Sequence, residues 1–349
     1  MKKILVFMVC LFSMTAGYGQ DSMSKAAAPL ISGYAGVYYK YNFNENATDN
    51  KTSFTRSQNS FELGMLSVKI QHDFGKVSFT GDLGFGKRAE EFSYNDKGTS
   101  AAIKQLYIDY TPLPWLKLTA GSFATYIGYE SVDANVNKNY SMSYLFTYGP
   151  FFHTGLKAEA SVGDHTFMLG VFNATDYKYA PPGSKKYIGA QWKLAREESP
   201  FSLLLNYLGG TDTAGVRSDQ ADLVITYRLN KHFNMAYDGS YCRYGGNVPA
   251  ADWWGSDLYL NAVLSETFSL TLRTEYFNDG YNLRVFTDKE RFAGGGNIWS
   301  FTLSGNYKLK ALMLIPEIRL DRASSPLFTR KGKSVSASPS ALVAAVYSF

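Results

Sequence analysis

Apolar side chains recur at every second position in segment after segment of this chain, and this alternation restricts the fold more than any other feature. Period-two spacing places successive side chains on opposite faces of an extended strand. The last segment, Ser338 to Phe349, has this outer face: Ala341, Val343, Ala345, Tyr347 and Phe349. We expect this last strand to pair with the first and close a barrel, because an open sheet edge in hydrocarbon would leave backbone N–H and C=O groups unpaired.

The faces opposite the apolar ones carry many charges, and this distinguishes two kinds of barrel. A soluble lipocalin-like barrel uses about eight strands, with a polar outside and an apolar inside. In this chain the polar faces hold Asp82, Asp109, Lys157, Glu159, Arg228, Asp238, Arg273, Glu275, Glu317, Arg319 and Asp321. So many charges cannot fill a small dry interior. The apolar faces are therefore expected to point outward, into lipid.

The pattern repeats about sixteen times, with short turns alternating strictly with longer polar loops. An even number of strands places both termini on the periplasmic side. Aromatic residues make up 16% of the chain, with 26 Tyr and 24 Phe, as aromatic girdles at the two membrane interfaces require. No apolar run of about 18 residues follows residue 20, so helical membrane spans are excluded. The predicted fold is an all-β, transmembrane, antiparallel up-and-down β-barrel of about 16 strands, with both termini periplasmic.

The first 19 residues read as a secretory signal peptide, and residues 20–349 as one outer-membrane barrel domain. Lys2 and Lys3 precede the apolar stretch Ile4 to Phe12, and small residues end at Gly19. We expect export through the general secretory route to the outer membrane of a Gram-negative bacterium. Without the two lysines, the net charge of +5 becomes +3, too small and dispersed to indicate nucleic-acid binding. Cys242 would be the one cysteine left, so no internal disulfide is expected.

Several short motifs together resemble the OmpL-like β-barrel porin family of Bacteroidota. The most specific is Asn139-Tyr140-Ser141-Met142-Ser143, followed by Gly149-Pro150-Phe151-Phe152-His153-Thr154-Gly155. Leu272 to Gly280 resembles the family's Arg-x-Glu-Tyr-Phe-x-Asp pattern, and Pro316 to Asp321 repeats it two strands later. The resemblance spans most of the chain after the signal. It implies an outer-membrane channel for passive diffusion of small hydrophilic solutes, and it does not identify the solute.

The longest loop, about Thr125 to Phe152, is the candidate constriction of the pore. It holds Glu130, Asp133, Asn137 and Tyr140. A lumen of this width needs an element that narrows it, and a loop folded inward with a carboxylate would do so. The alternative is an ordinary surface loop.

Charged residues near the closing strand are the second part of the predicted site. Arg273, Glu275, Glu317, Arg319 and Asp321 point inward from two strands. Opposed charges on one pore wall would create a transverse field that orients polar solutes. Alternatively, they form ion pairs that neutralise one another and contribute little individually.

Two other functions stay open. A plugged barrel could serve as an adhesin or scaffold, and nothing in the sequence excludes it. An outer-membrane hydrolase would need an activated histidine near the loop end of the barrel. His153 is the one candidate, and the family resemblance interprets it as structural, so we expect no enzyme. No Cys/His cluster indicates a metal site, and no cofactor is expected.

The expected partners follow from this location. They are outer-membrane lipid and lipopolysaccharide, the barrel-assembly machinery acting on the strand that ends in Phe349, and small hydrophilic solutes. A homo-oligomer is possible, but no stretch identifies a subunit interface. Nucleic acid is not expected.

Overall fold

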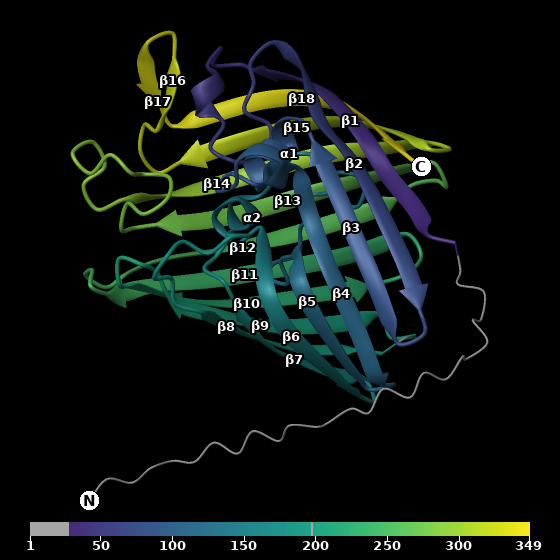
Figure 1. The fold of residues 1–349 in the computed structure, drawn as a ribbon. Helices are drawn as coiled ribbons and strands as arrows, with labels where there is room; N and C mark the ends of the chain where they lie inside the picture. The colour runs from purple at the N-terminus through teal and green to yellow at the C-terminus, as the bar shows by residue number, and fades with distance from the viewer. Residues whose placement is uncertain (1–27, 197) are drawn as a thin grey trace, which may run out of the picture.

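Sixteen antiparallel strands close into one barrel, as the alternation predicts (Figure 1). The structure, a computed structural model, describes residues 28–196 and 198–349, so the predicted signal peptide lies outside the described residues. The barrel strands are β1 (Leu30–Asn42), β2 (Ser60–Phe74), β3 (Val77–Phe85), β4 (Ile103–Leu113), β5 (Leu116–Ala124), β6 (Phe152–Val162), β7 (His165–Phe172), β8 (Tyr187–Ala195), β9 (Phe201–Thr211), β10 (Val216–Arg228), β11 (Phe233–Gly246), β12 (Ala251–Val263), β13 (Phe268–Asp279), β14 (Gly296–Leu309), β15 (Leu312–Ala323) and β18 (Ala337–Ser348).

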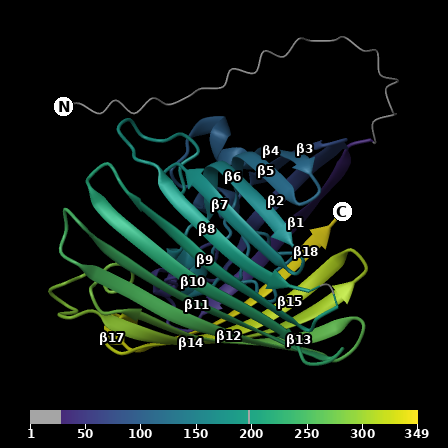
Figure 2. The same ribbon diagram turned by 90° about the horizontal axis from the view of Figure 1, so that it is seen from below.

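The last strand closes the barrel against the first, which confirms the expectation from the C-terminal segment. β18 pairs antiparallel with β1, with Ala35 opposite Tyr347 and Tyr41 opposite Ala341. β1 also pairs with β2, and β18 with β15, so neither terminal strand has a free edge. Figure 2 shows β1 and β18 side by side, and Figure 1 shows the start of β1 and the C terminus at the same end of the barrel.

Connections at that end are short throughout, and we call it the turn end and the opposite end the loop end. The predicted strict alternation of short and long connections is wrong at two places. β9 and β10 are joined by residues 212–215 alone, and β11 and β12 by residues 247–250. Both pairs of strands extend further toward the loop end than predicted. For β9 and β10 the reason is a tight hydrogen-bonded turn from Asp212 to Gly215.

The outside of the barrel is apolar between two bands of aromatic side chains. Toward the loop end, the Tyr276 ring lies between Trp254 and Trp299, tilted against the first and edge-to-face with the second, with ring centroids 5.1 and 4.9 Å apart. Toward the turn end, Phe268 packs against Tyr307 at 6.4 Å. Such bands mark the two interfaces of a membrane-embedded barrel. No helix in the described part of the chain is long and apolar enough to cross a membrane.

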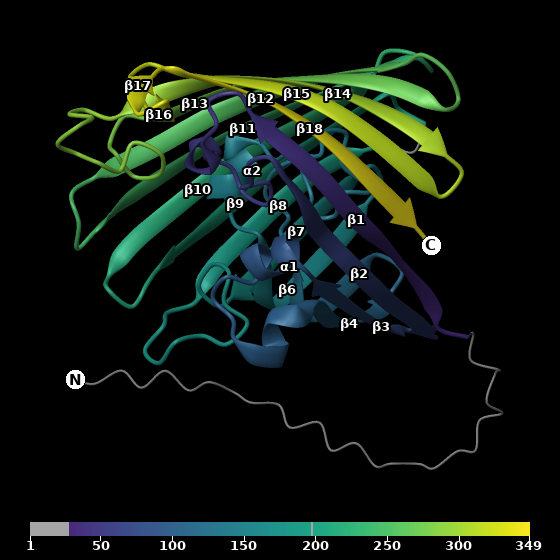
Figure 3. The same cartoon turned by 90° about the horizontal axis from the view of Figure 1, so that it is seen from above.

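The long loops contain short elements that the alternation did not predict. They are η1 (Ala47–Asp49), α1 (Lys87–Phe92), η2 (Gly98–Ala102), α2 (Tyr144–Tyr148) and the hairpin of β16 (Phe328–Arg330) and β17 (Lys333–Val335). α1 and α2 lie within the ring of strands in Figures 1 and 3, and α2 contacts β12 and β13. Ser143 caps α2, because its hydroxyl accepts a hydrogen bond from the Phe146 amide. α2 thus places the last part of the longest loop against β12 and β13.

Candidate functional site

The loop between β5 and β6, residues 125–151, runs through the inside of the barrel. Its middle part, Asn135 to Lys138, lines a cavity of about 230 Å³ with the turn Ser265–Thr267 between β12 and β13. That turn belongs to the turn end, whereas the loop starts and finishes at the loop end. The loop therefore extends down the lumen, and we call it the internal loop.

Carboxylates of the barrel wall hold the internal loop by its backbone N–H groups. The four that do so come from β10, β11, β13 and β15: Asp222 accepts from Gly128 (3.0 Å), Asp238 from Tyr129 (2.9 Å), Glu275 from Tyr144 and Leu145 (2.5 and 3.1 Å), and Glu317 from Tyr140 and Ser141 (2.8 and 3.2 Å). The wall thus fixes the main chain of the loop at four places.

Arginines hold the carbonyl groups of the same loop. Arg273 of β13 donates to the Ser141 carbonyl at 2.7 Å, and Arg319 of β15 to the Met142 carbonyl at 2.7 Å. Arg88 of α1 reaches over from the neighbouring loop and donates to the carbonyls of Val132 and Tyr140, at 2.9 and 2.8 Å. Carboxylates therefore bind the amide groups of the internal loop, and guanidinium groups bind its carbonyl groups.

Two ion pairs connect loop side chains to the wall. Arg273 lies 2.5 Å from Glu130, and both side chains are buried. Lys104 of β4 lies 2.5 Å from Asp133 and 3.1 Å from Asp82 of β3. The first pair fastens the loop to β13 and the second to the opposite side of the barrel, so the internal loop spans the lumen.

Glycines of the wall make room for large loop side chains at two of these contacts. A Cβ atom on Gly64 of β2 would lie 2.5 Å from the hydroxyl oxygen of Tyr140. A Cβ atom on Gly255 of β12 would lie 2.8 Å from Cδ2 of Leu145. Both distances are shorter than van der Waals contact, so a larger residue at either position would displace the side chain of Tyr140 or Leu145.

The predicted site residues thus fall into two groups by burial. Glu130, Tyr140 and the five wall residues are buried, whereas Asp133 and Asn137 are half-buried. Asn137 stays within the loop, where its side-chain amide exchanges two hydrogen bonds with the backbone of Ser131. Arg319 pairs with Asp321 at 2.8 Å, but Arg273 pairs with the loop and not with Glu275 of its own strand. In the structure, these residues mainly form the hydrogen bonds and ion pairs that hold the internal loop against the barrel wall.

Partly exposed charges lie elsewhere on the inner wall, on β5 and β6. Lys117, with 43% of its side chain exposed, lies 2.8 Å from Glu159, and Lys157 lies 3.4 Å from the same carboxylate. These groups are candidates for contact with solute, because water reaches them.

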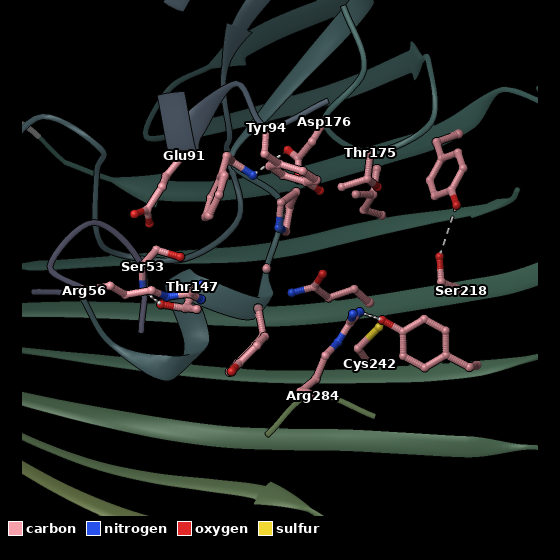
Figure 4. A pocket seen from close by; sticks show the side chains of 18 residues that line it. Ser53, Arg56, Glu91, Tyr94, Thr147, Thr175, Asp176, Ser218, Cys242 and Arg284 are labelled. Atoms are coloured by element: carbon pink, nitrogen blue, oxygen red, sulfur yellow. Dashed lines mark hydrogen bonds between the residues drawn. The ribbon is translucent and has the colours of Figure 1, made fainter. Parts of the chain in front are cut away.

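A larger cavity of about 430 Å³ opens among the loops at the loop end, and we call it the vestibule (Figure 4). Its floor, at Gly149, Pro150 and Gln220, continues into a crevice of about 10 Å³ that reaches Asp222 and Asp238. That volume corresponds to about one water molecule. The crevice lies beside the internal loop, against Ile127, Gly128 and Leu145.

His153, the one catalytic candidate, has a structural environment. Its ring stacks on Phe172 with centroids 5.1 Å apart and lies 4.8 Å from the ring of Tyr126. Its Nε2 is 3.1 Å from the Thr125 hydroxyl, and in the described residues it has no hydrogen bond to a serine or a carboxylate. No group of three or more His, Cys, Asp or Glu side chains in this same part of the chain is placed to hold a metal ion.

Sequence reasoning missed several residues of this site. Asp222 follows the period-two pattern between Ala221 and Leu223, so the alternation could have identified it as inward-facing. Arg88 lies in a loop helix and Lys104 at the start of a strand, where no periodic signal marks them. The arginines of the vestibule, Arg56 and Arg284, also lie in irregular loops.

Comparison with known proteins extends these observations. A family model described as putative beta-barrel porin-2, OmpL-like, matches residues 30–349. No curated protein matches the sequence.

Several solved structures share the fold at low sequence identity. An anion-selective porin from Comamonas acidovorans is 10% identical, with a TM-score of 0.62 over 92% of this chain and 99% of that one. The outer membrane channel DcaP of Acinetobacter baumannii is 13% identical, with a TM-score of 0.62 over 92% and 97%. OmpT of Vibrio cholerae is 11% identical, with a TM-score of 0.62 over 94% and 100%.

Proposed function

The chain belongs to the OmpL-like family of putative β-barrel porins, and we propose on this basis that it is an outer-membrane channel for passive diffusion of small hydrophilic solutes. The observation that carries the proposal is the combination of a closed 16-strand barrel with an apolar outer surface and a charged interior that contains cavities at both ends. Family and fold are those of a non-enzymatic channel. Both termini of the barrel then face the periplasm.

We propose that the internal loop forms the constriction. Two features support this: the loop is fastened to opposite sides of the lumen, at Arg273 and Lys104, and the crevice beside it has room for about one water molecule. Glu130, Asp133, Asn137, Tyr140, Arg273, Glu275, Glu317, Arg319 and Asp321 then act by setting the position of the loop. Direct contact with solute is assigned to Lys117, Lys157 and Glu159, which are partly exposed.

The remaining expectations about partners and processing are part of the same proposal. Residues 1–19 act as a signal for the general secretory route, and residues 20–349 form a single domain. Outer-membrane lipid and lipopolysaccharide cover the apolar band, and the assembly machinery acts on the strand ending in Phe349. One similar structure, OmpT of Vibrio cholerae, is described in a trimer form. A homo-oligomer is therefore included in the proposal.

Single-channel recording in planar bilayers tests the channel proposal. Refolded protein should give stable conductance steps, and small neutral polyols should pass in liposome-swelling assays while larger ones are excluded. Correctly folded protein, identified by its heat-modifiable gel mobility, that never conducts and never admits polyols would refute the proposal.

A plugged barrel that acts as a scaffold is the second candidate, and the crevice of about 10 Å³ favours it. The two candidates differ in one measurable respect. A plug held by the bonds described above stays closed in the wild type, and conductance emerges only in variants in which Glu130 or Arg273 is replaced.

A further inference from the structure

The vestibule has the features of a ligand site, although its walls are loops. Its volume of about 430 Å³ lies within the range of roughly 300–1,000 Å³ that is usual for small-molecule sites. Five separate loops and four strands, β8 to β11, contribute to its lining. In Figure 4, Ser53, Arg56 and Thr147 border the cavity on one side, Arg284 and Cys242 on another, and Tyr94 and Asp176 on a third.

The carboxylates of the vestibule are already engaged by the protein. Asp176 is 3% exposed and accepts hydrogen bonds from the Phe151 amide (2.7 Å), the Phe152 amide (3.0 Å) and the Tyr94 hydroxyl (3.0 Å). Glu91 accepts from the Phe54 amide at 2.7 Å. These two groups therefore hold loops in place and offer little to a ligand.

The two arginines have unused donors. Arg284 stacks over the ring of Tyr244, with Cζ 5.2 Å from the ring centroid, and donates one guanidinium N–H to the Tyr244 hydroxyl. Its Nε is buried and has no hydrogen-bond partner. Arg56 is exposed and has neither a hydrogen bond nor an ion pair with any residue that the structure describes. Nη1 of Arg284 also makes no hydrogen bond to any residue that the structure describes, so both arginines keep N–H donors for a ligand in the cavity.

Aromatic rings complete the lining between these charges. Tyr94 is 58% exposed at the edge of the cavity, and Tyr148, from the C-terminal end of α2, lies in its wall. The Tyr148 hydroxyl donates to the Lys51 carbonyl at 3.0 Å, so its ring is fixed in place. Aromatic faces combined with a few fixed polar groups suit a ligand that has a ring of its own.

We propose that the vestibule binds an acidic sugar, a pyranose ring that carries a carboxylate. The carboxylate is bound by Arg56 and Arg284, because guanidinium groups match carboxylates in shape and charge, and the sugar ring lies against Tyr94 and Tyr148. The inference rests on the proposed function in placing this site on the route of solutes, and it specifies their chemical class.

Equilibrium binding to the detergent-solubilised full-length barrel tests this inference without requiring conduction. The probes are glucuronate, glucose as its uncharged counterpart, and inorganic phosphate as an anion without a ring. We expect isothermal titration calorimetry to show glucuronate binding at least about tenfold more tightly than either control. Arg56→Gln and Arg284→Gln should each weaken glucuronate binding by about tenfold or more, which corresponds to one charge-assisted hydrogen bond.

Matched variants separate the site from general effects of charge and folding. Arg330→Gln removes the same charge from the exposed hairpin β16–β17 and should leave glucuronate binding unchanged. Tyr94→Ala should weaken glucuronate without strengthening phosphate. Arg56→Gln is the decisive variant, because Arg56 has no partner whose loss could disturb folding.

The outcomes distinguish the inference from the channel proposal. Equal binding of glucose and glucuronate, equal binding of phosphate, unaltered binding in Arg56→Gln, or no binding at tens of millimolar would each refute the acidic-sugar site. If the barrel conducts but shows any of these results, the acidic-sugar site is refuted and the channel proposal stands. If the barrel binds glucuronate but never conducts, the channel proposal is refuted.

Discussion

Arg273 and Glu130 lie 143 residues apart in the chain and form a buried ion pair, 2.5 Å between Nη1 and Oε1, at the junction of wall and internal loop. Arg273 also binds the Ser141 carbonyl, and Glu130 accepts the Ser143 amide at 2.8 Å. The pair therefore ties both limbs of the internal loop to β13.

Removing the carboxylate of this pair should loosen the internal loop. Breaking a buried ion pair on one side costs about 3–5 kcal/mol, because the remaining charge stays buried without its partner. We expect Glu130→Ala to lower the free energy of unfolding in detergent by this order and to raise single-channel conductance with added current noise. Glu290→Ala, in an exposed loop position, is the matched control. The double variant Glu130→Met, Arg273→Met should recover much of the stability, and an unchanged conductance in Glu130→Ala would contradict the loop's role.

The seat of Tyr140 offers a steric test of the same loop. Gly64→Leu would place atoms where the Tyr140 hydroxyl now lies, 2.5 Å from an added Cβ. We expect the loop around Tyr140 to leave its seat and become accessible to chymotrypsin in the folded barrel. Gly245→Leu is the control, because no atom lies within 4 Å of a Cβ at that wall position. Equal protease resistance in both variants would show that the space beside Gly64 is not needed to hold Tyr140 in place.

Asp176 should make loop stability depend on pH. Burial raises its pKa from 3.8 to about 6, although hydrogen bonds from Phe152, Phe151 and Tyr94 act in the opposite direction. Between these values the folded state binds a proton that the unfolded state has released. The contribution of this group to stability is therefore complete below about pH 4 and lost as the pH rises through about 6.

The variant Asp176→Asn removes this titration. Between about pH 4 and 6 the wild type should lose stability relative to the variant as the pH rises. The loss in its relative unfolding free energy should reach up to about 1.4 kcal/mol per pH unit. Urea titrations in detergent at several pH values measure it. A difference that stays constant with pH, or changes with the opposite sign, would exclude Asp176 as the group responsible.

We expect Phe349 to contribute to closure of the barrel through its backbone as well as through its aromatic ring. Phe349 and Gly33 exchange two backbone hydrogen bonds, of 2.9 and 3.0 Å. Deletion of Phe349 should reduce the folded fraction, measured by heat-modifiable mobility on gels, more than Phe349→Ala, which keeps both bonds. If assembly depends on the aromatic ring alone, the two variants will behave alike.

The sequence predicted the barrel well because alternation reports directly on which face of a strand meets lipid. Val343 and Tyr347 of β18 and the terminal Phe349 are exposed on the outside, and Arg273, Glu275 and Glu317 are buried on the inside, as predicted. The short connections after β9 and β11 were missed because polar residues such as Arg217 and Asp219 interrupt the apolar pattern there, although the backbone continues as strand.

The contacts of the internal loop were beyond sequence reasoning for a different reason. Its backbone N–H and C=O groups make most of the bonds to the wall, and such groups are present at every residue, whatever the side chain. Length and composition indicated that the loop 125–151 could fold inward. That Asp222, Glu275 and Glu317 each bind its amides depends on the path of the loop in space, which no local pattern encodes.

This mode of attachment has a consequence for how such proteins can diverge. Since wall side chains bind the main chain of the internal loop at Gly128, Tyr129, Tyr144 and Leu145, substitutions at most loop positions leave the anchoring bonds intact. Selection can then alter the side chains that meet solutes while the loop keeps its course through the lumen. Relatives that share this architecture can therefore acquire new solute preferences through loop mutations, without rebuilding the barrel.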